Sequence, residues 1–230
     1  MYKLVIFDFD GTIFDTYDAI EHSVLLTFST LLPGFTAPLD QVRRLVSTGA
    51  PPGNTFRSLH PDPNIFDEDR WVKTYRELYA AHGQQRAKPF PGAELVLRSL
   101  RARDIPIVII SNKGVEALKS ALTKTGLLGY FPEPFILGDG IPGVTRKPDP
   151  SSFTDVMLPR LKELYGEREG EVLMVGDTRT DIQFARNIGA KVSWCRYGQG
   201  DSEECDRLNP DFTIDSVIDL LDLVGVPKTE

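Results

Sequence analysis

Cysteine is scarce in this 230-residue chain, and long apolar runs are missing. The two cysteines, Cys195 and Cys205, form no Cys-x-x-Cys pair, which argues against the disulfide framework typical of small secreted domains. No apolar run approaches the roughly 20 residues that cross a bilayer as a helix. The apolar stretch near the N-terminus is too short for a signal peptide and is interrupted by an acid. We therefore expect a cytoplasmic protein without a membrane partner.

An excess of positive charge is also missing. The chain has 26 lysine and arginine residues against 33 aspartate and glutamate residues, for a net charge of -7. Nucleic-acid-binding domains usually carry a basic patch or stripe, so we expect no nucleic-acid partner. A small anionic substrate remains compatible, because a metal ion and one lysine can reverse the local charge. Composition leaves the oligomeric state open.

Three short apolar runs, at residues 4–7, 105–110 and 172–175, each end at polar residues and are typical of buried strands. Helical periodicity follows at residues 93–103, 114–125 and 181–188, and residues 216–223 resemble a terminal helix. Residues 191–195 and 211–214 are candidate edge strands. Alternating strands and helices predict an α/β fold, a Rossmann-like parallel sheet covered by helices on both faces.

One stretch interrupts this alternation. Residues 15–88 show helical patterns at 17–32, 38–46 and 69–81 and no convincing strand, and the runs Pro51-Pro52-Gly53 and Pro61-Asp62-Pro63 break them. We predict that residues 1–14 and 89–230 form the α/β core. Residues 15–88 are then an all-helical subdomain inserted after the first strand.

Two acidic motifs follow predicted strands. Asp8 and Asp10 leave the first strand, while Asp177 leaves a later one and Asp181 follows within the first helical turn. The carboxyl ends of parallel strands share one edge of a sheet, where ligands bind. Close carboxylates resist joint ionisation unless a cation joins them, and Mg²⁺ prefers such oxygen ligands. The alternative explanations are an Asp-Gly turn and the capping of a helix by acids.

Two further motifs suit a phosphate. Ser111 and Asn112 precede a predicted helix, whose N-terminus attracts anions, although either residue could be a plain cap. Lys147, before Pro148, could place a positive charge on a phosphate, or could be a solvated lysine in a turn. Each motif is weak alone, and their joint occurrence carries the argument.

Together, Asp8-x-Asp10-Gly11-Thr12, Ser111, Lys147-Pro148 and Gly176-Asp177-x-x-x-Asp181 resemble the four ordered motifs of the haloacid dehalogenase-like hydrolases. The resemblance covers essentially the whole chain, and the helical insert resembles that family's cap domain. Within the superfamily, Ser111-Asn112-Lys113 and the stretch from Ile136 to Pro150 look most like phosphoglycolate phosphatases.

The resemblance implies an activity and roles for these residues. It implies a Mg²⁺-dependent phosphatase that hydrolyses a small phosphate monoester through an aspartyl phosphate, with Asp8 as nucleophile and Asp10 as proton donor and acceptor. Magnesium would be held by the Asp8 carboxylate, the Asp10 backbone carbonyl and Asp177, supported by Asp181. Phosphate would be bound by Ser111, Asn112 and Lys147.

Other readings of the motifs remain open. A phosphosugar mutase with the same nucleophile and a non-catalytic regulatory or binding module of the same fold are the alternatives. Dehalogenases of the superfamily lack an acid at the Asp10 position, which favours phosphoryl transfer here. In related proteins a cap loop faces the substrate; here the matching stretch, residues 47–54, and the arginine beyond it offer Thr48, Gly49, Asn54 and Arg57 as candidate substrate contacts.

Overall fold

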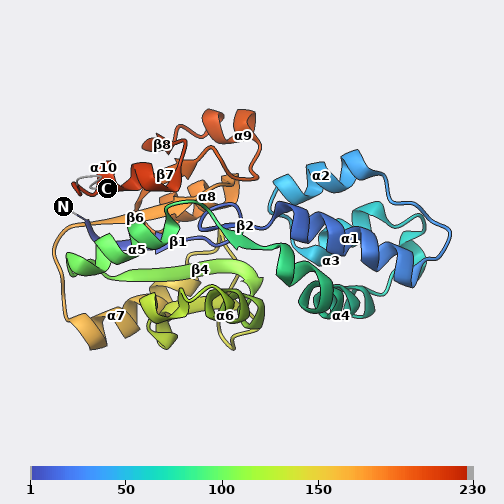
Figure 1. Ribbon diagram of the computed structural model, residues 1–230, viewed down its shortest axis with the longest axis horizontal. Helices are drawn as coiled ribbons and strands as arrows, with labels where there is room; N and C mark the ends of the chain where they lie inside the picture. Colours follow the sequence, from blue (N-terminus) through green and yellow to red (C-terminus); the bar gives the residue numbers. More distant parts are fainter. Residues whose placement is uncertain (1, 227–230) are drawn as a thin grey trace. The chain divides into compact units, whose positions relative to one another are not determined.

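The computed structural model describes residues 2–226 and divides them into two compact units (Figure 1). Thr16–Lys88 form unit 2, and the described residues before and after that segment form unit 1. Two short strands, β2 (Phe14–Asp15) and β3 (Lys88–Pro89), pair where the chain passes from one unit to the other. Unit 1 contains every residue of the four sequence motifs.

A six-stranded sheet forms the centre of unit 1, in the order β5-β4-β1-β6-β7-β8. Its members are β1 (Tyr2–Phe7), β4 (Ile107–Gly114), β5 (Ile136–Asp139), β6 (Glu171–Gly176), β7 (Lys191–Cys195) and β8 (Phe212–Ile214). Each neighbouring pair is parallel, with Val5 of β1 opposite both Ile107 and Leu173. The predicted Rossmann-like parallel sheet is confirmed, with the first strand at its centre.

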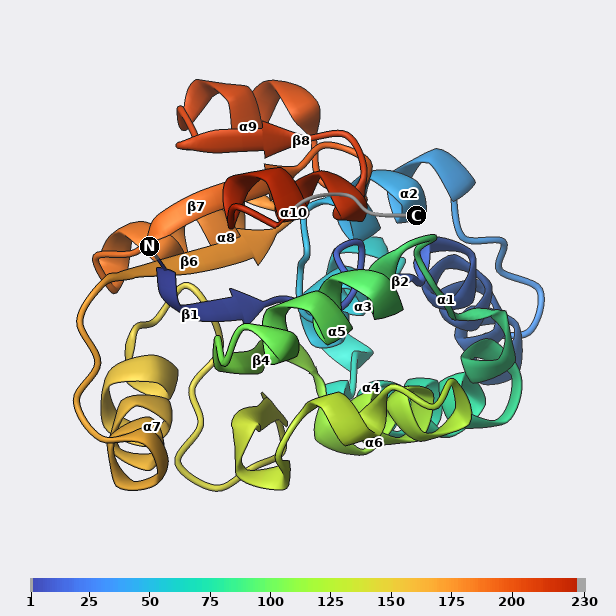
Figure 2. The same ribbon diagram turned by 60° about the vertical axis from the view of Figure 1, so that its left-hand side comes forward.

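Helices cover both faces of this sheet (Figures 1 and 2). One face packs against α7 (Leu158–Tyr165) and α8 (Arg179–Asn187), and the other against α5 (Ala93–Ala102) and α10 (Leu220–Leu223). Helix α6 (Val115–Lys124) contacts β4 and β5, and α9 (Ser202–Arg207) contacts α8. Shorter helical turns lie at Leu128–Tyr130, Glu133–Phe135, Ser152–Met157 and Val217–Asp219.

Alternation along the strands explains why both faces need cover. Leu4 and Ile6 of β1 share one core with Phe184 of α8 and Leu161 of α7, while Val5 and Phe7 point to the opposite face and are also fully buried. A strand that is apolar at every position has no face for water, which is the pattern of a buried parallel strand. The apolar runs at residues 4–7 and 172–175 predicted strands for this reason.

Unit 2 is helical, with α1 (Tyr17–Leu31), α2 (Leu39–Ser47), α3 (Pro52–Leu59) and α4 (Glu68–Leu78). Helical turns at Pro63–Ile65, Tyr79–Gly83 and Gln84–Arg86 complete it. Its core is aromatic. Phe28, Phe56 and Trp71 contact one another and Tyr75 contacts Phe56, with ring centroids 4.8–5.7 Å apart. Such ring pairs add roughly 0.5–1.5 kcal/mol beyond their area burial, so aromatic packing stabilises this small unit.

The proline runs of unit 2 lie between its helices, as the sequence predicts, but the first run also begins a helix. The run Pro51-Pro52-Gly53 follows the end of α2 at Ser47, and α3 begins within it, at Pro52. Proline is well tolerated in the first turn of a helix, where its missing N–H would have no intrahelical partner. Asn54 and Arg57, expected in or just beyond a loop, therefore lie on α3, and the connection from α2 spans only Thr48–Pro51.

Candidate active site

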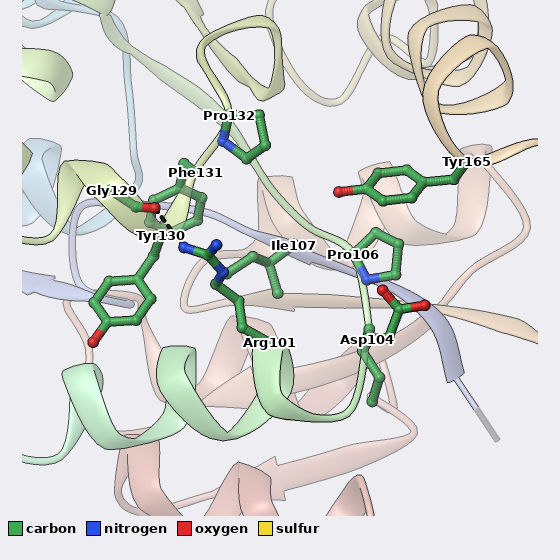
Figure 3. Close-up of a pocket in the computed structure, with 10 residues that line it drawn as sticks. Arg101, Asp104, Pro106, Ile107, Gly129, Tyr130, Phe131, Pro132 and Tyr165 are labelled. Atoms are coloured by element: carbon green, nitrogen blue, oxygen red, sulfur yellow. Dashed lines mark hydrogen bonds between the residues drawn. The ribbon is translucent and has the colours of Figure 1, made fainter.

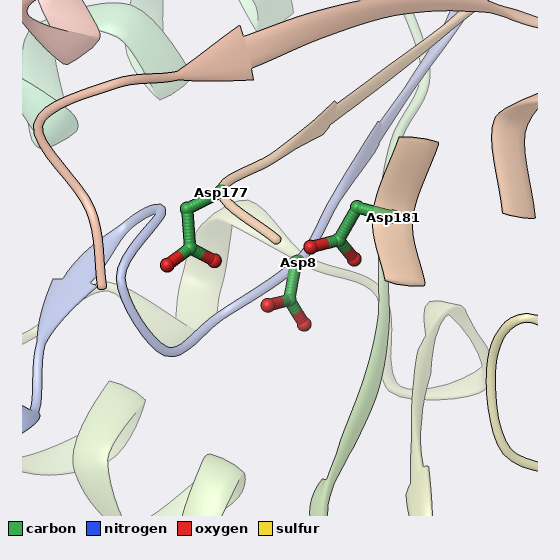
Figure 4. Close-up of side chains that lie close together, drawn as sticks. All are labelled: Asp8, Asp177 and Asp181. Atoms are coloured by element: carbon green, nitrogen blue, oxygen red, sulfur yellow. The ribbon is translucent and has the colours of Figure 1, made fainter. Parts of the chain in front are cut away.

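Three aspartates meet at the carboxyl edge of the sheet (Figure 4). Asp8 follows β1, Asp177 follows the adjacent strand β6, and Asp181 lies in the first turn of α8. One carboxylate oxygen from each lies within 4.8 Å of the others, and all three residues are buried. The sequence prediction that these acids share one edge agrees with their positions.

Lys147 joins two of these aspartates. Its Nζ atom lies 2.8 Å from Oδ1 of Asp8 and 2.6 Å from Oδ1 of Asp181, and only 2% of its side chain is exposed. One ammonium faces three carboxylates, so full ionisation leaves two negative charges uncompensated. Two such charges about 4 Å apart repel by roughly 4 kcal/mol at an effective dielectric near 20.

The pKa values reflect this excess of buried charge. Burial raises the pKa of Asp8 to about 6; the Lys147 ammonium opposes the change, and the charge of Asp181 adds to it. Burial, with the charges of Asp181 and Asp8, also raises the pKa of Asp177 well above its usual range. Burial works to lower the pKa of Lys147, but Asp181 and Asp8 outweigh it and the pKa is raised. The three buried carboxylates therefore have less positive charge near them than their full ionisation requires.

Asp181 uses both of its carboxylate oxygens within the protein. Oδ1 accepts from Lys147, and Oδ2 accepts from the backbone N–H and the hydroxyl of Thr178 at 3.0 and 2.8 Å. This arrangement is a capping box at the start of α8. Asp8 and Asp177 thus keep more free oxygen capacity for a ligand than Asp181 does.

Asp177 is enclosed by backbone from two loops. Its Oδ2 accepts from the backbone N–H of Gln199 at 2.7 Å, and its carbonyl accepts from the indole N–H of Trp194 at 2.9 Å. A Cβ added at Gly11, Gly198 or Gly200 would overlap Asp177. The loop at residues 198–200 is not among the four sequence motifs, although a Gly-x-Gly after a predicted strand indicates close backbone approach.

Asp10 lies apart from the three clustered aspartates and has its own cation. Nζ of Lys113 lies 2.9 and 3.3 Å from the two carboxylate oxygens of Asp10, and the Lys113 side chain is only 7% exposed. The Lys113 ammonium also lies 6.0 Å from the ring centroid of Phe9. Lys113 belongs to the Ser111-Asn112-Lys113 motif, but its spacing in the sequence does not predict this contact with Asp10.

Ser111 and Asn112 lie inside β4 and not in a helix cap. The strand was expected to end at residue 110, but it continues to Gly114, and α6 begins only at Val115. Ser111 is buried, and its hydroxyl accepts from the backbone N–H of Lys113 at 3.3 Å. The Asn112 amide bonds the backbone of Lys147, through Oδ1 at 2.8 Å and Nδ2 at 3.1 Å.

The remaining predicted contacts, Thr48, Gly49, Asn54 and Arg57, all belong to unit 2. Within that unit the Arg57 guanidinium contacts Glu68 at 2.8 Å and lies over the Phe66 ring. The Thr48 hydroxyl donates to the carbonyl of Leu45 at 2.7 Å. These local partners explain both side chains without a ligand, and their role in binding substrate stays a prediction.

A divalent cation fits the aspartate cluster by the chemistry of its donors. Hard cations such as Mg²⁺ and Ca²⁺ take carboxylate, carbonyl and water oxygens, and the cluster offers carboxylates that lack sufficient positive charge. Within residues 2–226 it is the one group of three or more acidic, histidine or cysteine side chains close enough to share an ion. The buried aspartates could therefore bind a metal.

A separate cavity of about 300 Å³ lies at the opposite end of β4, where Ile107 begins the strand (Figure 3). Its charged side chains have partners in the protein. Arg101 donates to the carbonyl of Gly129, and Asp104 pairs with Arg168 at 2.8 Å. The cavity is not part of the aspartate site and offers no unpaired charge for a substrate.

No helix within residues 2–226 is both long and apolar enough to cross a membrane.

Comparison with known proteins identifies the family of this chain. A family model described as haloacid dehalogenase-like hydrolase matches residues 5–195. The chain is 30% identical over 222 residues to pyrophosphatase PpaX of Halalkalibacterium halodurans, covering 96% of each protein. It is also 30% identical over 230 residues to phosphoglycolate phosphatase of Vibrio parahaemolyticus, covering 97% of this chain and 96% of the relative.

A solved structure has the same fold. The haloacid dehalogenase-like hydrolase of Streptococcus pneumoniae aligns with a TM-score of 0.79 at 22% identity, covering 97% of this chain and 98% of that one. The matched family model spans the aspartates, Ser111 and Lys147. The chain therefore belongs to the haloacid dehalogenase-like hydrolase family and is a phosphatase of that family.

Proposed function

We propose that this phosphatase is Mg²⁺-dependent and hydrolyses a small phosphate monoester through an aspartyl phosphate on Asp8. The observation that carries the proposal is the Asp8 carboxylate, buried at the end of the central strand, 2.8 Å from Lys147 and within reach of Asp177. A nucleophile needs this combination of a fixed position and a nearby positive charge.

Asp8 performs the first chemical step. One of its carboxylate oxygens forms a bond to phosphorus, the ester P–O bond breaks, and the electron pair stays on the leaving oxygen. With a pKa of about 6, Asp8 is mostly ionised at neutral pH, which is the state a nucleophile requires. Lys147 stabilises the negative charge of the phosphoryl group as it approaches this carboxylate.

Asp10 handles the proton in both steps. It donates a proton to the leaving oxygen, then accepts one from the water that attacks the aspartyl phosphate and releases Asp8. Lys113, 2.9 Å away, holds the Asp10 carboxylate in one orientation beside the site. An oriented acid is more effective than a mobile one, because orientation entropy is lost before the reaction begins.

Mg²⁺ would be held by the Asp8 carboxylate, the Asp10 backbone carbonyl and Asp177, with Asp181 as a support that anchors Lys147. When bound, such a metal stabilises negative charge on the phosphoryl oxygens as a Lewis acid. Ser111 and Lys147 would bind phosphoryl oxygens, as would any free N–H of Asn112. The buried Ser111 hydroxyl on β4, next to the central strand, supports this assignment.

The substrate is proposed to be a small monoester similar to phosphoglycolate. Unit 2 corresponds to the cap expected from the family resemblance, and a cap that closes over a site limits substrate size and excludes water. Relatives at 30% identity bear the names phosphoglycolate phosphatase and pyrophosphatase. Both names refer to small anionic phosphates, so phosphoglycolate and pyrophosphate both belong in a substrate panel.

The test measures phosphate release from a panel that includes phosphoglycolate, pyrophosphate, sugar phosphates and p-nitrophenyl phosphate, with Mg²⁺ or with EDTA. We expect release to require Mg²⁺ and to fall at least a thousandfold in Asp8→Asn. Asp215→Asn is the matched control, because Asp215 is exposed and pairs with Arg196. Isomerisation of a sugar phosphate without phosphate release would instead favour a mutase, and the absence of both reactions would favour a binding module.

A further inference from the structure

The side chain of Asn112 connects two of the four motifs. Its Oδ1 accepts from the backbone N–H of Lys147 at 2.8 Å, and its Nδ2 donates to the carbonyl of the same residue at 3.1 Å. An amide that bonds both backbone groups of one residue reproduces the pairing of a neighbouring strand. The two residues are 35 positions apart in the chain, so this contact fixes tertiary structure.

Asn112 lies in a strand of the central sheet. That strand is β4, whose residues 107–109 pair with the central strand β1, and Asp8 directly follows β1. Lys147, in contrast, lies in a loop outside the regular helices and strands. The amide therefore ties a loop residue to the same sheet that positions the nucleophile.

The contacts of the Lys147 side chain depend on this placement. Its ammonium must reach Asp8 at 2.8 Å and Asp181 at 2.6 Å at the same time, although these residues come from different elements. A shift of the Lys147 backbone by about 1 Å would lengthen at least one contact, and misplacement of that size can cost a hundredfold in rate.

We propose that Asn112 is a positioning residue that acts on catalysis through Lys147, by holding the backbone of that lysine against β4. This inference rests on the proposed function for its kinetic consequences and on the structure alone for the placement of Lys147. It assigns the Asn112 side chain to the lysine, where the sequence had suggested a direct phosphate contact.

Asn187 provides a matched control on the same loop. Its Nδ2 donates to the carbonyl of Pro148 at 2.8 Å, so it is also an amide bonded to backbone, one residue further along. It bonds neither backbone group of Lys147. An effect that comes merely from losing an amide bond to this loop would be as large in Asn187→Ala as in Asn112→Ala.

The kinetic test is a double-mutant cycle with Lys147→Ala. We expect Asn112→Ala to lower kcat about ten- to hundredfold, as losses of supporting partners typically do, and Asn187→Ala to change it less than about threefold. In the Lys147→Ala background the same Asn112 substitution should change kcat less than about twofold, because residues that act through one another are not additive. Equal losses in both backgrounds, or a rise in KM with unchanged kcat, would overturn the proposal.

A second measurement does not depend on activity. The rate at which an acetylating reagent modifies Lys147, read by peptide mass spectrometry, should rise at least tenfold in Asn112→Ala and stay unchanged in Asn187→Ala, because Lys147 is now only 2% exposed. Asn112→Asp, which keeps an acceptor for the Lys147 N–H, should give an intermediate rate. Unchanged modification in Asn112→Ala would contradict the positioning role. If modification rises while the wild type hydrolyses no ester, positioning stands and the proposed function fails.

Discussion

At the scale of residues, the site holds more negative charge than the nearby lysine can neutralise. Asp8, Asp177 and Asp181 are buried together with one close ammonium, that of Lys147. Burial raises the pKa values of Asp8 and Asp177 because ionised carboxylates lose water there. A cation added to the cluster would lower the repulsion between its carboxylates. The same excess of negative charge therefore supports the proposed metal site.

The excess of negative charge predicts a pH-dependent effect of Asp8→Asn on metal-free stability. The pKa of Asp8 rises from 3.8 to about 6 on folding, so its contribution to stability is present below about pH 4 and is lost as pH rises through 6. In EDTA above pH 6, the free energy of unfolding of Asp8→Asn, measured by urea denaturation, should therefore exceed that of the wild type by up to about 3 kcal/mol. The difference should shrink toward pH 4, and a wild type that is the more stable protein at pH 7 would contradict this.

The role of Asp10 predicts a dependence on the leaving group. Alkyl phosphates release a strongly basic oxygen that needs a proton, whereas p-nitrophenolate leaves without one. Asp10→Asn should lower the rate of the phosphorylation step, measured by rapid quench, at least a hundredfold for an alkyl phosphate and by a several-fold smaller factor for p-nitrophenyl phosphate. An equal loss for the two esters would show that Asp10 does not supply that proton.

At the scale of elements, strand ends and loops bring the site together. β1, β4 and β6 are adjacent and parallel, so Asp8, Ser111 and Asp177 share one edge of the sheet. The loop after β7 then covers Asp177 with the backbone of Gln199 and two flanking glycines. A residue at a strand end is placed by the sheet itself and not by a contact between distant side chains. These positions could therefore be predicted from the sequence.

The glycines around Asp177 predict a steric effect on metal binding. Gly198 has no positive φ, yet an added Cβ would overlap Asp177 and the carbonyl of Gly11. Gly198→Ala should displace Asp177, raise the Mg²⁺ concentration needed for half-maximal activity at least tenfold and cost about 1–3 kcal/mol of stability. Gly129→Ala is the control, since its added Cβ meets nothing within 4 Å. Unchanged Mg²⁺ dependence in Gly198→Ala would contradict the enclosure of Asp177.

Strands with a continuous apolar run and helices with a clear helical period were predictable from sequence, and some short elements were not. The runs at 4–7 and 172–175 became β1 and β6, but β5, only four residues long, had too little pattern to be assigned. The strand expected at residues 105–110 stops before Ser111 and Asn112, which resemble a helix cap, whereas in the structure β4 continues through both residues to Gly114. Local propensity could not reveal that the partner of the Asn112 amide is Lys147, 35 positions further along the chain.

The site divides in the same way. Asp8, Asp10 and Asp177 were recognisable because they combine a strand end with a motif, and Lys147 because it precedes Pro148 in one of the four ordered motifs. The pairing of Lys113 with Asp10 and of Asn112 with Lys147 spans 103 and 35 positions, and no spacing rule connects residues at such separations. Tertiary geometry was needed to assign them.

At the scale of the whole molecule, the chain is an α/β unit that carries the acids and a helical unit with its own aromatic core. Metal binding to the first unit should stabilise its fold by mass action, since the unfolded chain offers no assembled cluster. The effect on thermal unfolding can be measured without any substrate.

Removal of the metal predicts a thermal shift. Mg²⁺ at about 100 times its Kd adds roughly 2.7 kcal/mol, which corresponds to a rise in Tm of about 5–10 °C for a chain of this size. EDTA should reverse the rise, and Asp177→Asn should abolish it. A similar rise in Asp177→Asn would place the metal elsewhere.

The central claim is that Asp8 carries the phosphoryl group. Borohydride reduces an acyl phosphate to an alcohol, so adding it during turnover should convert Asp8 to homoserine, which peptide mass spectrometry can locate. The account predicts this conversion at Asp8 when substrate and Mg²⁺ are both present, and at no other aspartate. Turnover with no reduced Asp8, or with the reduced residue at another position, would contradict it.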